Sequence, residues 1–137
     1  MKAIKFNYGL LFLCLVFIGL VGCSTMKYKN PDAPDYSVAV LTSDKPNRLR
    51  IATVDGKKAT GKFKGETVRE FPDTLRLLPG YHEIVPCLLS VKGVRYGETL
   101  TFYAQEEMEY VVCYKVKWDK TIRFWVECNG VDITTEN

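Results

Sequence analysis

Short segments in which apolar and polar residues alternate follow one another from Tyr36 to the end of the chain. Residues that favour turns separate these segments, for example Asp55-Gly56, Pro79-Gly80 and Lys92-Gly93. A period of two places the apolar side chains on one face of a strand, and no stretch of about ten or more residues after Cys23 has the 3.6-residue period of a helix. We therefore predict an all-β fold, a single antiparallel β-sandwich of roughly seven to eight strands over residues 36–137.

The last two of these segments, residues 110–118 and 122–128, predict a hairpin whose register follows from its pattern. A three-residue loop, Asp119–Thr121, gathers the apolar residues on one face and the charged residues on the other. Trp118 then lies opposite Ile122, and Trp125 is left on the outer face. The residues predicted to face the core are Tyr114, Val116, Trp118, Ile122, Phe124 and Val126.

Residues 1–22 differ from the rest of the chain in charge and in apolar content. They contain Lys2 and Lys5 and no acidic residue, and residues 6–22 carry no charge. A basic start, a short apolar stretch and small residues at its end are typical of a secretory signal peptide, which is cleaved. A permanent transmembrane helix is the alternative, because an uncharged run of about 17 residues is at the lower limit for crossing a bilayer.

The four residues Leu20-Val21-Gly22-Cys23 resemble the lipobox of bacterial lipoprotein precursors. The resemblance implies cleavage between Gly22 and Cys23 and attachment of fatty acids to Cys23, whose sulfur is the nucleophile that takes the lipid. Two or more acyl chains give stable anchoring to a membrane. Ser24 stands where lipoproteins retained at the inner membrane often have aspartate, so the resemblance implies an outer-membrane anchor and a domain facing the periplasm or cell surface. Residues 23–35, rich in proline and polar residues, are predicted to be the lipidated N-terminus and a flexible tether.

A second resemblance covers residues 49–118. The segment resembles a pattern found in small bacterial lipoproteins and PEGA-type domains. In that pattern one strand ends in a D-G-K turn, a second strand reaches a P-G turn, and an H-x-[IV] strand follows. The residues that carry it are Val54–Lys57, Leu75–Ile84, Phe102–Glu106 and Tyr110. It implies an immunoglobulin-like or prealbumin-like sandwich that is non-catalytic. The long insertion between Gly56 and Thr74 departs from the pattern and leaves the strand pairing around Phe63 open.

The charges of the chain are nearly balanced once residues 1–22 are removed, because these take two of the 19 basic residues and none of the 16 acidic ones. The lysines that crowd residues 57–64 lie next to Asp55 and Glu66, so we interpret this segment as a solvated hairpin and expect no nucleic-acid partner. The chain has one histidine, His82, which excludes a metal site built on several histidines, and we expect no metal and no cofactor. His82 follows the Pro79-Gly80 turn, where a ring hydrogen-bonded to neighbouring backbone is favoured over a catalytic triad, so we predict that the protein is not an enzyme.

Three cysteines, Cys87, Cys113 and Cys128, remain if Cys14 leaves with the signal and Cys23 takes the lipid. An odd number in an oxidising compartment implies a free thiol or a bond to another chain. The predicted register puts Cys113 and Cys128 on opposite faces. One hypothesis is therefore a disulfide from Cys87 to one of the other two, and the alternative is three reduced cysteines.

Taken together, these features predict a membrane-anchored lipoprotein that binds or structurally supports a partner in the cell envelope. Tyr96, Tyr103 and Trp125 are candidate contact residues, because aromatic side chains on a polar face are often used at interfaces. A periplasmic binder of a small ligand or glycan is the alternative, and it predicts a pocket lined by aromatic side chains with a few polar groups.

Overall fold

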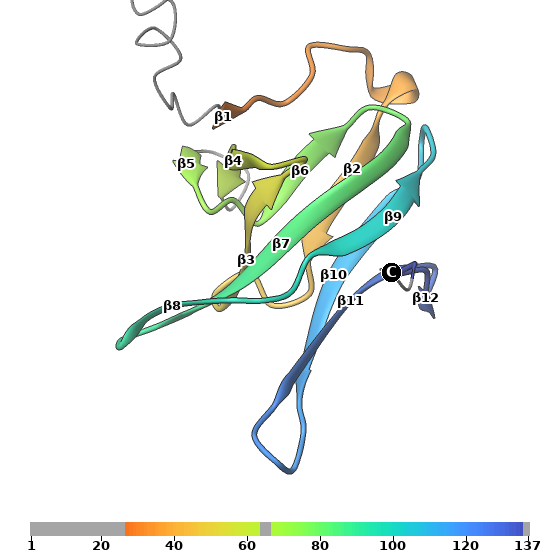
Figure 1. The fold of residues 1–137 in the computed structure, drawn as a ribbon. Helices are drawn as coiled ribbons and strands as arrows, with labels where there is room; N and C mark the ends of the chain where they lie inside the picture. Colours follow the sequence, from red (N-terminus) through yellow and green to blue (C-terminus); the bar gives the residue numbers. More distant parts are fainter. Residues whose placement is uncertain (1–26, 64–66, 136–137) are drawn as a thin grey trace, which may run out of the picture.

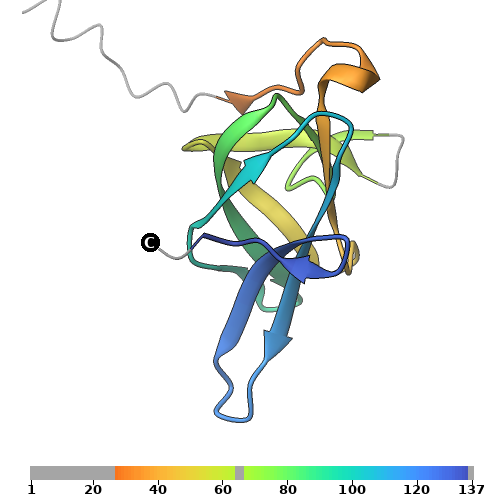
Figure 2. The ribbon, with the colours of Figure 1, turned by 90° about the vertical axis from the view of Figure 1, so that its right-hand side faces the viewer.

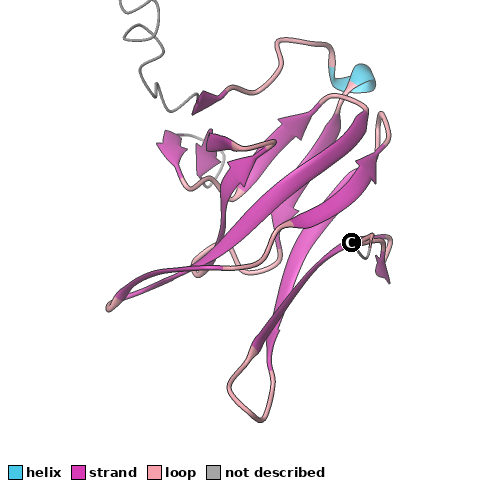
Figure 3. Cartoon of the chain, viewed as in Figure 1, coloured by secondary structure: helices cyan, strands magenta, loops and turns pink. Residues whose placement is uncertain are grey.

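The computed structural model describes the backbone of residues 27–63 and 67–135 and the side chains of residues 27–61 and 70–135. Residues 1–22 and Cys23, on which the signal-peptide and lipobox predictions rest, lie outside this part of the chain. The predicted all-β fold is confirmed: strands dominate, and the one helical element described, η1 (Asp35–Ser37), is a single 3-10 turn (Figure 3). Within the described residues, no helix has the length and apolar character needed to cross a membrane.

Two β-sheets pack face to face as a sandwich (Figure 1, Figure 2). The first sheet is built around the long strand β7 (Gly80–Ser90), which has β3 on one side and both β8 and β9 on the other. β4 joins the two sheets, because its first residues pair with β3 and its later residues pair with β5. The other strands of the first sheet are β1 (Lys27–Tyr28), β3 (Leu49–Val54), β4 (Lys57–Phe63), β8 (Gly93–Tyr96) and β9 (Leu100–Ala104).

The second sheet runs from β12 through β11, β10, β2 and β6 to β4, with β5 beyond it. Its remaining strands are β2 (Ala39–Ser43), β5 (Thr67–Glu70), β6 (Thr74–Leu77), β10 (Glu109–Val116), β11 (Ile122–Cys128) and β12 (Val131–Asp132). The described residues thus form 12 strands, more than predicted, because strands of two to four residues such as β1, β5, β8 and β12 are too short for alternation to be recognised. Two pairings, β1 with β4 and β2 with β10, are parallel, and the other strand pairings described are antiparallel.

The core lies between the inner faces of the two sheets. Leu41 and Leu75 from the second sheet face Ile84 and Phe102 from the first, and none of the four is exposed. Phe102 packs against the ring of Tyr110, with centroids 5.3 Å apart. Burying side chains of this size stabilises the fold by about 1.5–3 kcal/mol each, so the sandwich is held mainly by this layer.

Pro86 marks the point at which β7 changes its neighbours. On one side the register with β3 shifts between Ile51 and Thr53, which is a β-bulge. On the other side β9 pairs as far as Ile84, and β8 begins to pair at Cys87. Proline, which has no N–H to donate, is tolerated at such a break in the ladder. The second half of β7 can therefore continue with β8 as a separate hairpin.

The β10–β11 hairpin keeps the predicted faces but not the predicted register. Val116 pairs with Ile122, and the N–H of Lys117 bonds to the carbonyl of Thr121 (2.8 Å), so the three-residue loop is Trp118–Lys120. The loop begins one residue earlier than predicted because Asp119 Oδ1 accepts hydrogen bonds from the N–H and hydroxyl of Thr121, at 3.0 and 2.6 Å. This turn holds Asp119 inside the loop.

Two residues predicted to face the core lie outside it, although the hairpin keeps its predicted faces. Phe124 and Val126 are buried as predicted. Trp118 is 97% exposed and Val116 is 55% exposed, so their predicted places in the core are wrong. The reason is that the hairpin extends past the last residues of the opposite sheet (Figure 1).

Candidate functional site

Two hairpins project beyond the core at the end of the domain remote from β1 (Figure 1). We call them the β7–β8 arm (Leu88–Arg95) and the β10–β11 arm (Tyr114–Phe124). The first arm turns at Val91 and Lys92, where Gly93 has a φ of +128°, a value that glycine reaches without strain. The two arms diverge, so the inner face of each is not covered by the other.

An open groove of about 780 Å³ lies between the arms. Its lining residues are Asn47, Arg48, Leu88, Leu89, Ser90, Val91, Tyr114 and Val116. Most of them are apolar, and they come from both sheets, so the groove is the open end of the sandwich interior. Lys45 Nζ lies 5.1 Å from the centroid of the Tyr114 ring, so a cation lies at the edge of the groove. A concave, mainly apolar surface with a few polar groups is the usual form of a binding site.

Exposed apolar side chains gather on these arms. Val91, at the tip of one arm, and Trp118, at the tip of the other, are 104% and 97% exposed. Val94 and Val116 are exposed further along the arms. Clustered exposed apolar groups mark interaction sites more often than scattered ones do.

Basic residues are frequent in the segments that carry the groove and the hollow described next. They lie on the arms and on the loop that joins β2 to β3: Lys45, Arg48, Lys92, Arg95, Lys115, Lys117, Lys120 and Arg123. The acids in these segments are Asp44 and Asp119, and hydrogen bonds from Thr121 lower the pKa of Asp119. Exposed acids instead occur toward the other end, at Glu106, Glu107 and Glu109 in the β9–β10 corner and at Asp32 and Asp35. The domain is therefore basic at its arms, although its total charge is close to balance.

A smaller hollow of about 330 Å³ lies on the β10–β11 arm. Its lining residues are Lys115, Val116, Lys117, Trp118, Arg123 and Trp125. The guanidinium of Arg123 lies 5.4 Å from the centroid of the Trp125 ring, and Trp125 Nε1 donates a hydrogen bond to Glu127 Oε1 (2.7 Å). Two indole rings beside cationic groups suit a ligand that has both a stacking face and negative charge.

The three aromatic residues predicted as contacts do not form one surface. Tyr96 and Tyr103 lie on the outer face of the first sheet, opposite Cys87 and Tyr81 of β7, which are about 20 Å apart along the strand. Tyr103 packs edge-on against Tyr81, with ring centroids 4.9 Å apart. Trp125 lies on the second sheet and is half-buried. The sequence did not predict the groove itself, because exposed valines and leucines near a turn cannot be distinguished from core residues by alternation.

His82 is buried and bonded through both ring nitrogens. Nδ1 lies 2.8 Å from Asp55 Oδ2, and Nε2 lies 2.7 Å from the carbonyl oxygen of Leu78. Asp55 Oδ1 also accepts the N–H of Glu83 (2.9 Å), so these contacts tie the β3–β4 turn to the start of β7. Both ring nitrogens are therefore engaged in contacts within the domain.

The cysteines Cys87, Cys113 and Cys128 are all free thiols in the structure, so the hypothesised disulfide from Cys87 is not formed there. Burial raises the pKa of Cys87 to about 11, against a smaller opposing effect of Arg50. Burial and the nearby Glu127 raise the pKa of Cys113 to about 12. Both thiols are thus held in their unreactive protonated form near neutral pH.

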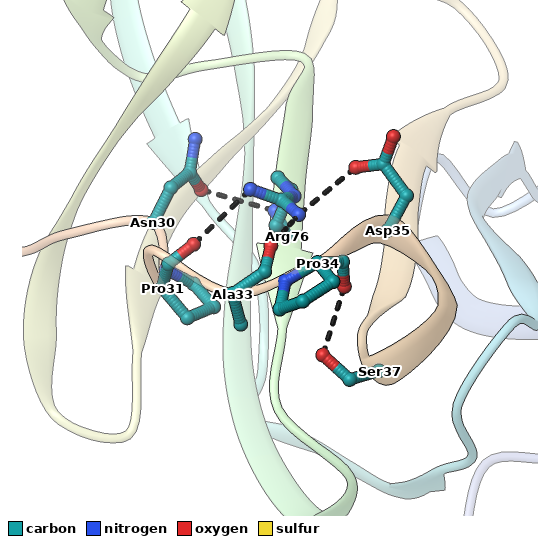
Figure 4. Close-up of polar contacts among 7 residues, drawn as sticks. All are labelled: Asn30, Pro31, Ala33, Pro34, Asp35, Ser37 and Arg76. Carbon is teal, nitrogen blue, oxygen red and sulfur yellow. Dashed lines mark hydrogen bonds and ion pairs between the residues drawn. The ribbon is translucent and has the colours of Figure 1, made fainter.

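The N-terminal segment from Lys27 to Asp35, predicted to be a free tether, is docked on the domain (Figure 4). We call it the strap. The Arg76 guanidinium donates to the carbonyl oxygens of Pro31 (3.2 Å) and Ala33 and pairs with Asp35 Oδ1 at 3.0 Å. The Arg76 N–H donates to Asn30 Oδ1 (3.0 Å). Residues 27–35, which were predicted to belong to a flexible tether, are therefore held on the domain by an arginine far away in the sequence.

The start of the strap is also anchored. Its first two residues form β1 beside β4, where Lys27 lies opposite Lys58. The hydroxyl of Tyr28 donates to the carbonyl of Arg76, and the hydroxyl of Thr60 donates to the carbonyl of Tyr28. Burial, with a contribution from Asp55, raises the pKa of Tyr28 to about 12. The strap is thus fixed to the domain from its first described residue.

No protein-family model, no curated protein and no solved structure matches the chain. Within the described residues, no group of three or more histidine, cysteine, aspartate and glutamate side chains is placed to hold a metal ion. The arms, the groove and the strap are therefore the features of the domain that bear on its function.

Proposed function

We propose that this protein is a lipid-anchored bacterial envelope protein whose non-catalytic β-sandwich binds a partner in the envelope through the groove between its arms. The observation that carries the proposal is the gathering of exposed apolar side chains around an open groove, at the end remote from the strap. A lipidated Cys23 in the outer membrane, as the lipobox implies, supplies the anchor.

The docked strap supports this arrangement. Cys23 precedes Lys27 by four positions, and an extended chain of that length spans at most about 14 Å. A lipid on Cys23 therefore keeps β1 close to the bilayer. Because the arms lie at the opposite end of the domain, the groove is presented away from the membrane (Figure 1, Figure 2).

A photocrosslinking amino acid incorporated at Val116 or Val91 in the full chain, in the native host, tests the binding site. The matched control is Val131, which is 63% exposed on β12. We expect crosslinked products from the two arm positions at yields well above the control. Equal yields from all three positions would show that the groove is not a binding site.

The anchor is tested separately with Cys23→Ser. We expect the variant to remain unprocessed and to lack the lipid found by mass spectrometry on the wild-type amino terminus. An unmodified amino-terminal peptide in the wild type would contradict lipidation and leave the groove hypothesis standing.

A glycan or small-ligand binder is the second candidate, and the hollow on the β10–β11 arm favours it. Trp118 and Trp125 offer stacking faces, with Lys115, Lys117 and Arg123 beside them. Titration of the Trp fluorescence of the full chain with envelope oligosaccharides tests this candidate. Quenching that Trp125→Ala abolishes and Tyr103→Ala leaves intact is the result that would favour it.

A further inference from the structure

We infer that the groove between the arms takes an acidic polypeptide segment that carries apolar side chains. This inference rests on the proposed function and adds the chemistry of the partner. It has two parts, the apolar lining of the groove and the charge around it.

The shape of the site favours a polypeptide over a lipid surface. The groove is concave and is lined from both sheets, by Leu88 on one side and by Tyr114 and Val116 on the other. A flat bilayer would meet the two tips, Val91 and Trp118, and leave this lining uncovered. A polypeptide segment with apolar side chains can enter the groove, whose volume is about 780 Å³, and bury its apolar lining.

The charge around the groove selects an acidic chain. None of the lining residues given above is acidic, and Arg48 is one of them. Lys45 lies at the edge of the groove over Tyr114, and Lys92 follows Val91 at the tip of the β7–β8 arm. The nearest acids in sequence are Asp44, on the loop beside Lys45, and Asp119, whose carboxylate is bonded to Thr121. Complementary charge of this kind guides a partner to its site and rejects partners of like charge.

The decisive experiment maps what the photocrosslinker at Val116 captures in the full chain. We expect a protein segment in which Asp and Glu outnumber Lys and Arg and alternate with apolar residues. A neutral or basic segment, a lipid, a glycan or a second copy of this chain would overturn the inference. Yields no higher than at Val131 would overturn the proposed groove function as well, which separates the two failures.

A charge-reversal variant gives a second, independent readout. Arg48→Glu combined with Lys45→Glu should lower the yield at Val116 roughly tenfold, which corresponds to about 1.4 kcal/mol lost over two exposed charges. The matched control is Lys57→Glu combined with Lys58→Glu, which makes the same change of charge near β1 and should leave the yield unchanged. An equal effect of both pairs, or no effect of either, would refute the role of charge at the groove.

Discussion

Replacing Arg76 with methionine should loosen the second half of the strap, from Pro31 to Asp35. The change removes the guanidinium bonds to the carbonyls of Pro31 and Ala33 and the ion pair with Asp35, and it keeps the length of the aliphatic side chain. The backbone bond from residue 76 to Asn30 does not depend on the side chain and remains. The variant should therefore loosen the strap without disturbing β6.

The magnitude follows from the exposure of each partner. The Asp35 side chain is fully exposed, so its ion pair contributes little. The Arg76 side chain is 28% exposed, and its two bonds to carbonyl oxygens each contribute about 0.5–1.5 kcal/mol. The free energy of unfolding should fall by about 2 kcal/mol, or roughly 8 °C in Tm for a domain of this size.

Two measurements check this prediction. Urea denaturation gives the change in free energy, and amide hydrogen exchange should become faster over residues 31–35, with the protection of β1 and β7 retained. The matched control is Asp35→Ala, which removes only the exposed ion pair and should change stability by less than about 0.5 kcal/mol. A strap that stays protected in Arg76→Met, or an Asp35→Ala variant that loses as much stability, would refute the assignment of the carbonyl bonds.

Three further predictions concern buried groups of the domain. At pH 8, alkylation of Cys87 and Cys113 by iodoacetamide should be at least about 100-fold slower in the folded chain than in urea, because a pKa of about 11 or 12 leaves so little thiolate. Mass spectrometry measures the rate of alkylation, and equal rates in the folded and unfolded chain would contradict burial of the two thiols. His82→Ala should lower the free energy of unfolding by about 2 kcal/mol, since it removes two partly buried hydrogen bonds of a buried ring. A loss below about 1 kcal/mol in urea denaturation would count against these bonds. Gly97→Ala should lower the free energy of unfolding by about 1–3 kcal/mol, because the added Cβ would lie 2.8 Å from the ring of Phe124. Thermal unfolding measures the effect, and an unchanged Tm would mean that the Phe124 ring can move away from residue 97 without loss of stability.

Local patterns predict a strand where one of its faces is buried. The segments 110–118 and 122–128 were expected from alternation, and the structure has β10 (Glu109–Val116) and β11 (Ile122–Cys128) there. The parallel pairing of β2 with β10 was not predicted, because no local signal links two segments so far apart in the chain. Which strands become neighbours depends on burial of the whole core.

The two wrong placements in the candidate site have specific causes. Trp118 was assigned to the core from alternation, but the side chain of Asp119 fixes the loop one residue earlier and leaves Trp118 at its tip. The strap was assigned to a free tether from its prolines and polar residues. Composition near Pro31 could not reveal that Arg76 supplies donors for its carbonyl oxygens.

The strap also makes a prediction about how the groove is presented. If lipid on Cys23 and docking at Lys27 together set the height of the arms, a ten-residue Gly/Ser insertion after Met26 should uncouple them, because it adds a flexible reach of about 16–19 Å. We expect the free energy of unfolding to stay unchanged, since the insertion precedes every described contact, and the crosslinking yield at Val116 to fall. An unchanged yield would mean that the partner reaches the groove at any distance from the membrane. The docked strap would then contribute to the stability of the domain and not to its position above the membrane.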